Sequence, residues 1–278
     1  MTHNARVRSA GTLFAIIVVA VACNGGTTTP APTPTSAAAS PTASPSAAAS
    51  PTAVPGSDPT ALGMTKATLT TQGFAFRQHA QPFLGVWEAR SLPPGGSFSH
   101  PQIMPALGYV AEGALRWTTP NGSIDLKTGE AAGTPHVLPI TENNPGATAT
   151  LWYAFGVAET GLESETLATM RRLATGNRLP LPQPDGPYTL RLDSIALEGG
   201  GRTASRSHGG AAMIFVLEGQ VEVRTSGAHN FRGPKEGLGI PPGGAVEVLN
   251  RTPTPARILE FFYTPDALSF ETTLTTPP

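Results

Sequence analysis

The chain has 278 residues, and its 18 lysines and arginines nearly balance its 19 aspartates and glutamates. This balance excludes a broadly basic surface, so we expect no nucleic-acid partner. Charged residues make up only 13% of the chain, against about 25% in an ordinary globular domain. The single cysteine excludes an intramolecular disulfide framework and a CxxC metal site.

Residues 11–22 form an apolar run that follows two arginines. The run is shorter than the roughly 20 residues of a spanning helix and is typical of the hydrophobic region of a secretory signal peptide. Small residues then lead into Cys23. This pattern resembles the lipobox of bacterial lipoproteins, although that family more often has leucine at the position of Ala20. The resemblance implies cleavage before Cys23 and a lipid on its thiol; the alternative is a plain exported protein with an incidental cysteine.

The segment after Cys23 is built almost entirely from alanine, proline, serine and threonine, and Asp58 is the only charged residue between 27 and 60. Such a segment has little to bury and cannot offset its chain entropy. We expect a disordered spacer that holds a domain away from the outer face of a bacterial membrane.

The rest of the chain is rich in short apolar or alternating runs separated by glycine and proline, which is typical of an all-β protein. Pro120, Asn121 and Gly122 separate two such runs and predict a hairpin with a type I′ turn. The expected strands lie at 68–76, 83–89, 106–111, 114–117, 148–157, 188–197, 212–217, 220–224, 245–249 and 256–263.

One helix is expected between the two halves of this region. Ser164 is a suitable N-cap, Leu167, Met170 and Leu173 share a face, and Gly176 is a suitable end. This segment would connect the halves.

The two halves repeat one pattern. A histidine, an apolar strand and a turn glycine occur between Gly96 and Gly113 and again between Gly201 and Gly219. The second copy contains IFVLEGQVEV and a later Ile-Pro-Pro-Gly turn, and it resembles the two motifs of the cupin superfamily. The resemblance covers most of residues 83–263 and implies a bicupin.

The expected fold class is therefore all-β, with two antiparallel jelly-roll cupin barrels joined by a short helical connector behind a disordered N-terminal linker. The expected boundaries are a signal peptide at 1–22, a lipid-anchored linker at 23–60, a first barrel at 61–160, a connector at 161–186, a second barrel at 187–270 and a C-terminal tail at 271–278.

The resemblance also implies candidate metal ligands, because metal-binding cupins use a His-x-His pair, a following glutamate and a later histidine. Carried over by position, the first copy offers His100, Gln102, Leu107 and His136, so an apolar residue replaces the carboxylate. His100, Gln102 and His136 would form a partial site for a divalent ion such as Fe, Mn, Ni, Cu or Zn. The alternative is that the histidines form hydrogen bonds inside the barrel without a metal.

The second copy offers Arg206, His208, Met213 and Val246 at these positions. A guanidinium opposes a metal ion, so no metal is expected in the second barrel.

Arg206 and His208 are two residues apart on one expected strand, so both would face the same way. An inward arginine is costly unless it is paired. A carboxylate, phosphate or sugar-acid ligand would pair with it through a bidentate contact, which makes Arg206 and His208 candidate ligand-binding residues. The alternatives are an internal partner such as Glu218, Glu222 or Glu247, or an arginine that reaches solvent at the end of the barrel.

Three functions remain open. The first is a membrane-anchored binding or scaffold protein with degenerate metal sites, whose ligand is a small anionic or sugar-like molecule. The second is a metalloenzyme of dioxygenase or isomerase type that uses the first barrel. The third is metal-free acid–base chemistry by His100 or His136. The sequence leaves open whether the protein is an enzyme.

Overall fold

Every regular element that the computed structural model describes is a β-strand, as the alternating sequence predicted. The described residues are 61–75, 83–102, 105–134, 138–159, 171–175, 179–181, 186–276 and 278, and all belong to one unit, Ala53–Pro278. The expected signal peptide, the whole expected linker with Cys23, and His136 lie outside them. No helix among the described residues has the length and apolar composition needed to cross a bilayer.

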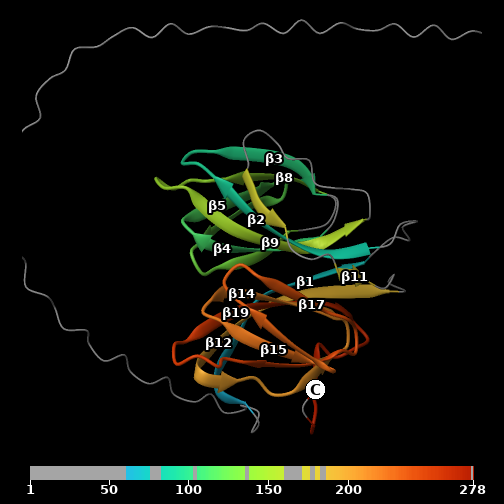
Figure 1. Cartoon of the computed structure of the whole chain (residues 1–278). Helices are drawn as coiled ribbons and strands as arrows, with labels where there is room; N and C mark the ends of the chain where they lie inside the picture. The colour runs from blue at the N-terminus through green and yellow to red at the C-terminus, as the bar shows by residue number, and fades with distance from the viewer. Residues whose placement is uncertain are drawn as a thin grey trace, which may run out of the picture. The chain divides into compact units, whose positions relative to one another are not determined.

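The first barrel consists of two antiparallel sheets, drawn mainly in green in Figure 1. One sheet contains β2 (Phe83–Leu92), β4 (Ala106–Glu112), β7 (Ala131–Thr134), β9 (Thr150–Glu159), β10 (Arg171–Thr175) and β11 (Leu179–Leu181). The other contains β3 (Ser97–Gln102), β5 (Ala114–Thr119), β6 (Gly122–Lys127) and β8 (Leu138–Asn143).

The second barrel is a single ten-stranded sheet, drawn mainly in orange in Figure 1. Its strands are β1 (Leu62–Ala75), β12 (Pro187–Arg202), β13 (Arg206–His208), β14 (Ala211–Glu218), β15 (Val221–Thr225), β16 (Ala228–Arg232), β17 (Gly237–Ile240), β18 (Ala245–Leu249), β19 (Ala256–Pro265) and β20 (Glu271–Thr273).

Both ends of the folded chain contribute to this second sheet. β1 pairs antiparallel with β12 over almost its whole length, from Leu62 opposite Arg202 to Ala75 opposite Pro187. The first strand after the linker therefore lies in the sheet of the second barrel, although the sequence placed it in the first. β20, in the expected tail, pairs with β13.

The predicted helix is wrong over residues 171–175, which form β10 and pair with β2. β11 pairs with the same strand further along. β2 has β9 on its other side, so without these segments its outer backbone groups would lack partners. That requirement outweighs the local helical pattern. Residues 160–170, with the proposed cap Ser164, lie outside the described residues.

The predicted hairpin is confirmed, but its turn differs from the expected one. β5 and β6 pair up to Thr119 opposite Gly122, so the loop residues are Pro120 and Asn121. A type I′ turn needs positive φ at both loop residues, which the proline ring forbids. Only Gly122 has a positive φ here, 138°.

On the strands that lie between the two barrels, successive side chains point alternately into the interior of their own barrel and toward the other barrel. In β9, Trp152 belongs to the core of the first barrel, whereas Tyr153 and Phe155 belong to a cluster shared by both barrels. In β19, Phe262 is interior and Phe261 joins the shared cluster.

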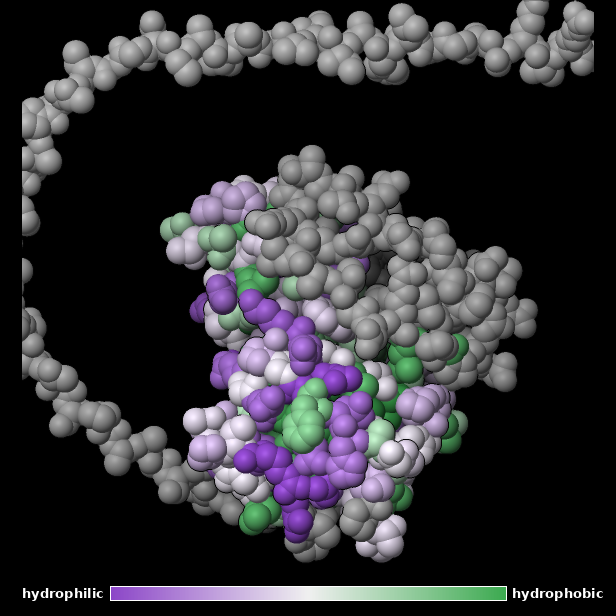
Figure 2. Space-filling view, in the orientation of Figure 1, coloured by the Kyte–Doolittle hydropathy of each residue, from purple (hydrophilic) through white to green (hydrophobic). Residues whose placement is uncertain are grey.

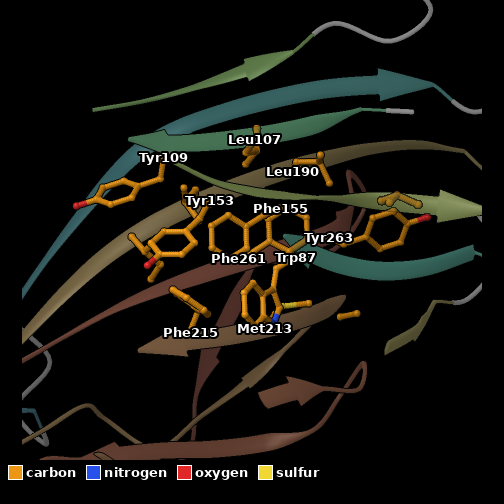
Figure 3. Close-up of a cluster of buried hydrophobic side chains, with 14 of the residues drawn as sticks. Trp87, Leu107, Tyr109, Tyr153, Phe155, Leu190, Met213, Phe215, Phe261 and Tyr263 are labelled. Atoms are coloured by element: carbon orange, nitrogen blue, oxygen red, sulfur yellow. The ribbon is translucent and has the colours of Figure 1, made fainter. Parts of the chain in front are cut away.

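This shared cluster makes the two barrels one packed body, and Figure 3 shows side chains from both barrels converging in it. The ring centroid of Phe215 lies 4.6 Å from those of both Trp87 and Tyr153. The approach is close enough that a Cβ at Gly237 would lie 2.9 Å from the indole nitrogen of Trp87.

One asparagine holds the same turn in each barrel. Asn144 Nδ2 donates to the backbone oxygens of Leu92 and Thr148, at 3.1 and 2.8 Å. Asn250 Nδ2 donates to those of Leu197 and Thr254, at 3.3 and 2.7 Å. These matching hydrogen bonds support the internal repeat. The turn glycines match as well, because Gly113 and Gly219 both have positive φ, at 79° and 75°.

Charged side chains form a ladder on the outer face of β15 and β18. Glu222 Oε1 accepts from Arg224 Nε at 3.0 Å and lies 2.6 Å from His229 Nδ1. Its other oxygen accepts from Arg251 Nε at 2.7 Å. Figure 2 shows hydrophilic side chains gathered over this part of the second barrel. Burial alone would raise the pKa of Glu222, but these partners outweigh it and lower the pKa to about 2.

Candidate functional site

Arg206 and His208 both point into the second barrel. They are buried at 6% and 1% exposure, while Ser207 between them is half-buried. This alternation follows from the pleat of β13 and agrees with the sequence-based expectation that the two side chains share a face.

Arg206 has internal partners on two strands and one loop. Its Nη2 donates to Glu260 Oε1 at 2.7 Å, and its Nε lies 2.8 Å from Glu271 Oε1. Nη1 donates to Thr203 Oγ1 at 2.6 Å and to the backbone oxygen of Ala204 at 3.3 Å. All three nitrogens of the guanidinium therefore have acceptors or counter-charges nearby.

An internal partner was one of the alternatives that the sequence left open for Arg206, but the carboxylates differ from those named from the sequence. Glu222 lies in the outer ladder, and Glu247 faces Arg224 there at 3.4 Å. Glu218 pairs with Arg257.

The ion pairs continue beyond Arg206 as a network. Glu271 Oε2 accepts from Arg191 Nη2 at 2.9 Å and from Lys66 Nζ at 2.5 Å. Asp193 Oδ2 lies 2.9 Å from Arg191 Nη2 and 3.1 Å from Lys66 Nζ. Lys66, Arg191 and Arg206 thus face Asp193, Glu260 and Glu271, and the fixed charges balance.

This arrangement controls ionisation at the centre of the network. Burial alone would raise the pKa of Glu260, but Arg206 and His208 outweigh it and hold that pKa well below its usual range. Burial alone would lower the pKa of Arg206, but Glu260 and Glu271 raise it. Both groups are therefore charged at neutral pH.

His208, Glu260 and Glu271 are the one group of potential metal ligands found among the described residues, with ligand atoms within 4.8 Å of one another. Glu260 Oε1 lies 3.2 Å from His208 Nε2 and also accepts from Arg206. A divalent ion at this point would compete with a guanidinium for the same oxygens and be repelled by it. The donor set therefore fits an internal ion pair better than a metal ion.

Two aromatic rings flank the network. The guanidinium carbon of Arg191 lies 4.3 Å from the ring centroid of Phe262 and 4.2 Å from that of Phe270. Phe262 belongs to β19, whereas Phe270 directly precedes β20, so the C-terminal segment covers one face of Arg191. Such cation–π contacts are strengthened when the cation is shielded from water.

The first barrel contains a smaller polar group. Arg90 Nη1 donates to Glu142 Oε1 at 3.2 Å, and Arg90 Nε donates to Glu88 Oε2 at 3.0 Å. His100 Nε2 lies 3.8 Å from Glu142 Oε1, and the His100 ring stacks on Phe98 at 5.0 Å. The other oxygen of Glu142 is buried and has no hydrogen-bond partner in the described part of the chain.

Of the three candidate metal ligands in the first barrel, only His100 is described in full. Gln102 ends β3, but its side chain is outside the described set, as is the whole of His136. The register corrects one proposed equivalence. Arg206 pairs with Val246 and His100 pairs with Ile140, so Ile140 takes the place that the sequence alignment gave to His136.

The two apolar residues aligned with the missing glutamate do not face the barrel interiors. Leu107 and Met213 both belong to the cluster between the barrels. Ala212, the residue before Met213, belongs to the interior core of the second barrel. Ala106 comes before Leu107 on β4 in the same way, so it faces the same side of its strand as Ala212 does. The expected carboxylate position is therefore alanine in both copies.

The carboxylates that pair with Arg206 and with Arg90 inside the barrels lie on other strands, and the sequence did not reveal them. Glu260 interrupts the apolar run from Ile258 to Tyr263 in β19, and this is a recognisable signal for a buried, paired acid. Glu142 has a weaker signal as an inward residue of β8. Glu271 had none, because it lay in the expected tail.

No family model matches this chain, and neither does any of the curated proteins searched. Solved structures do match. AerE from Microcystis aeruginosa is 12% identical with a TM-score of 0.51, and the match covers 71% of this chain and 99% of that one. Oxalate decarboxylase from Bacillus subtilis is 13% identical with a TM-score of 0.51, covering 70% and 71%. Oxalate decarboxylase from Lactobacillus farciminis is 12% identical with a TM-score of 0.53, covering 70% and 80%.

At these identities the matches establish the fold alone. The chain has the all-β, two-barrel cupin fold that the resemblance of its motifs implied.

Proposed function

We propose that this protein is exported, cleaved before Cys23, anchored by a lipid on that cysteine to the outer face of a bacterial membrane, and carries a two-barrel domain that binds a small anionic molecule. The segment between Cys23 and the first strand serves as the spacer. The ligand class is a carboxylate or sugar acid, and its site is the interior of the second barrel at Arg206 and His208.

One observation carries the ligand class. Arg206, Arg191 and Lys66 converge inside the barrel, and one of the carboxylates that neutralise them, Glu271, comes from a three-residue strand near the end of the chain. Its side chain is 22% exposed, whereas those of Asp193 and Glu260 are at 0%. A ligand carboxylate that reached the place of Glu271 would meet the same three cations.

Titration calorimetry of the purified protein tests the proposal, with acetate, succinate and galacturonate as probes. We expect at least one probe to bind, and Arg206→Lys to weaken it about tenfold or more, because an ammonium cannot reproduce the bidentate contact. Arg224→Lys, on the outer ladder, is the matched control and should bind as the unaltered protein does. Equal binding by both variants would remove Arg206 from the site.

A metalloenzyme that uses the first barrel is the second candidate, and Glu142 favours it. Its unpartnered oxygen is buried, and its other oxygen is 3.8 Å from His100 Nε2, so it is a carboxylate donor that the sequence alignment lacked. One matching structure, of Bacillus subtilis oxalate decarboxylase, is described as having Mn(II) centres. If a divalent ion bound here, His100 and Glu142 would hold it, with Gln102 and His136 as the further candidates.

Metal analysis separates the two candidates. Under the binding proposal, protein purified with added Fe, Mn, Ni, Cu or Zn retains less than one ion per chain. One tightly held ion, lost on His100→Ala, His136→Ala or Glu142→Gln but retained in Arg224→Lys, would favour the enzyme instead.

The anchor is tested separately. Cys23→Ser should release the protein from membranes or block its processing, because no other cysteine is available for the lipid. Unchanged membrane retention and unchanged electrophoretic mobility would contradict lipidation while leaving the ligand proposal intact.

A further inference from the structure

The last segment of the chain lies across the interior network of the second barrel. We call residues 268–276 the C-terminal strap. Within it, β20 pairs with β13 and with no other described strand, and this pairing places Glu271 opposite His208. The strap is also held by the amide of Gly209, which donates to Ser269 O at 3.2 Å, and by that of Leu274, which donates to Ser205 O at 2.8 Å.

The strap follows a turn that is fixed to the barrel. The amide of Leu268 donates to Pro265 O at 2.9 Å, and Thr189 Oγ1 donates to Asp266 Oδ1 at 2.7 Å. Beyond this turn most strap residues are exposed or half-buried. A short strand with one paired edge and little burial belongs to the part of a fold that opens at low free-energy cost.

Glu271 is the residue through which the strap enters the network. Its two oxygens meet Arg206, Arg191 and Lys66, as described above, and it is the most exposed of the three network carboxylates. Without it, three cations would face only Asp193 and Glu260. That unbalanced set is an anion site rather than a stable empty interior.

Phe270 adds a second contact that would be lost with the strap. Its ring centroid lies 4.2 Å from the guanidinium carbon of Arg191 and 5.8 Å from the ring centroid of Phe262. When the strap leaves, Glu271 and Phe270 leave together, so Arg191 gains both a free face and unpaired donors for an incoming ligand.

We propose that Glu271 is a built-in competitor for the ligand carboxylate, and that the C-terminal strap leaves the barrel when the ligand binds Lys66, Arg191 and Arg206. This inference rests on the proposed anion-binding function and names the further residues of that site. A tethered carboxylate competes at an effective concentration of the order of millimolar. The ligand must exceed that competition, so weakening the strap should strengthen binding.

Two variants weaken the strap by different means. Glu271→Gln removes its charge. Gly209→Ala leaves every charge in place, but its Cβ would lie 2.3 Å from Ser269 O and push the strap backbone away. Glu218→Gln, in an exposed pair with Arg257, is the matched control. Circular dichroism shows whether each variant is folded. If Glu271→Gln does not fold, Gly209→Ala still tests the proposal.

The experiment titrates the purified full protein with succinate and galacturonate and follows amide hydrogen exchange with and without them. We expect both strap variants to bind about tenfold more tightly than the unaltered protein, and Glu218→Gln to match it. Ligand should also speed exchange at the Leu274 amide. Equal affinity in all four proteins, with that amide still protected, would overturn the strap while leaving the binding function standing. Absence of binding in all four would overturn both.

Discussion

Trp117 in the first barrel and Val223 in the second occupy matching places of the repeat, and their neighbours Gly108 and Ile214 match as well. A Cβ on Gly108 would lie 2.4 Å from the Trp117 ring, so the large side chain fills the space that Ile214 fills in the other barrel. The first barrel therefore pairs a large side chain with a glycine where the second pairs two side chains of intermediate size, and the backbone is the same in both. The comparison shows that a repeat can conserve the turns and still diverge in the interior.

The polar interiors diverge further. In the second barrel, three cations balance three carboxylates, and the C-terminal segment completes the set. In the first, Arg90 faces both Glu88 and Glu142, with His100 at the side. The charges in the second barrel therefore balance, whereas the first sets one arginine against two carboxylates.

The largest expected effect comes from breaking the balanced network. Arg206→Met should lower the free energy of unfolding by about 3–5 kcal/mol, because two carboxylates lose a buried partner. Urea unfolding followed by circular dichroism measures it. Arg116→Met, which breaks an exposed pair with Asp125, should show no measurable change. A loss in Arg206→Met no larger than in Arg116→Met would contradict the network.

Removing a shared aromatic ring tests whether the two barrels unfold together. Phe215→Ala should cost about 3–5 kcal/mol, because the ring is fully buried between the barrels. All three tryptophans, Trp87, Trp117 and Trp152, lie on strands of the first barrel, and two of them belong to its interior core, so their fluorescence follows the unfolding of that barrel. The fluorescence and circular dichroism midpoints should shift together, although the change is in the second barrel.

Separate transitions in that experiment, with an unshifted fluorescence midpoint, would show two independent barrels. Phe231→Ala is the control, because Phe231 is 58% exposed on the same barrel and should leave both midpoints in place.

The exchanged volumes predict a coupled pair in the first barrel. Gly108→Ala should cost about 1–3 kcal/mol by overpacking, and the cost should shrink when Trp117→Val is also present. Gly73→Ala is the control, since its Cβ would have no neighbour closer than 3.9 Å. Additive effects at 108 and 117, measured by thermal unfolding, would contradict the proposed exchange.

The smallest expected effect is on acid stability, and it belongs to the outer ladder of the second barrel. The pKa of Glu222 is lowered from 4.5 to about 2, so its stabilisation is present above pH 4.5 and is lost as the pH falls toward 2. We expect a loss of about 1 kcal/mol, reduced by solvent screening of the exposed Arg251 and His229. Glu222→Gln should flatten the stability profile between pH 5 and 2.5, and an unchanged profile would contradict the assignment.

The repeat made much of the fold predictable. Gly113 and Gly219 marked matching turns, and the alternation of Ile214, Val216 and their neighbours indicated strands with one face in a core. The segment around residue 173 was less predictable, because a helical pattern is local whereas the need of β2 for an edge partner is not.

The candidate site was predictable only in part. The spacing of Arg206 and His208 placed both on one face, because strand periodicity is a local property. Their partners Glu260 and Glu271 lie 54 and 65 positions beyond Arg206 in the chain. No local pattern connects residues so far apart.

The sequence alone determined that the chain is a repeated all-β unit behind an apolar run and a segment with a single charged residue, because periodicity, turns and composition act over a few residues. The tertiary structure alone decided which strands close each barrel and which charges meet inside it. β1 and β20 come from opposite ends of the folded region, yet Lys66 and Glu271 meet beside Arg206. Closing a sheet into a barrel brings such distant residues together, and this long-range pairing gives the second barrel its charge balance.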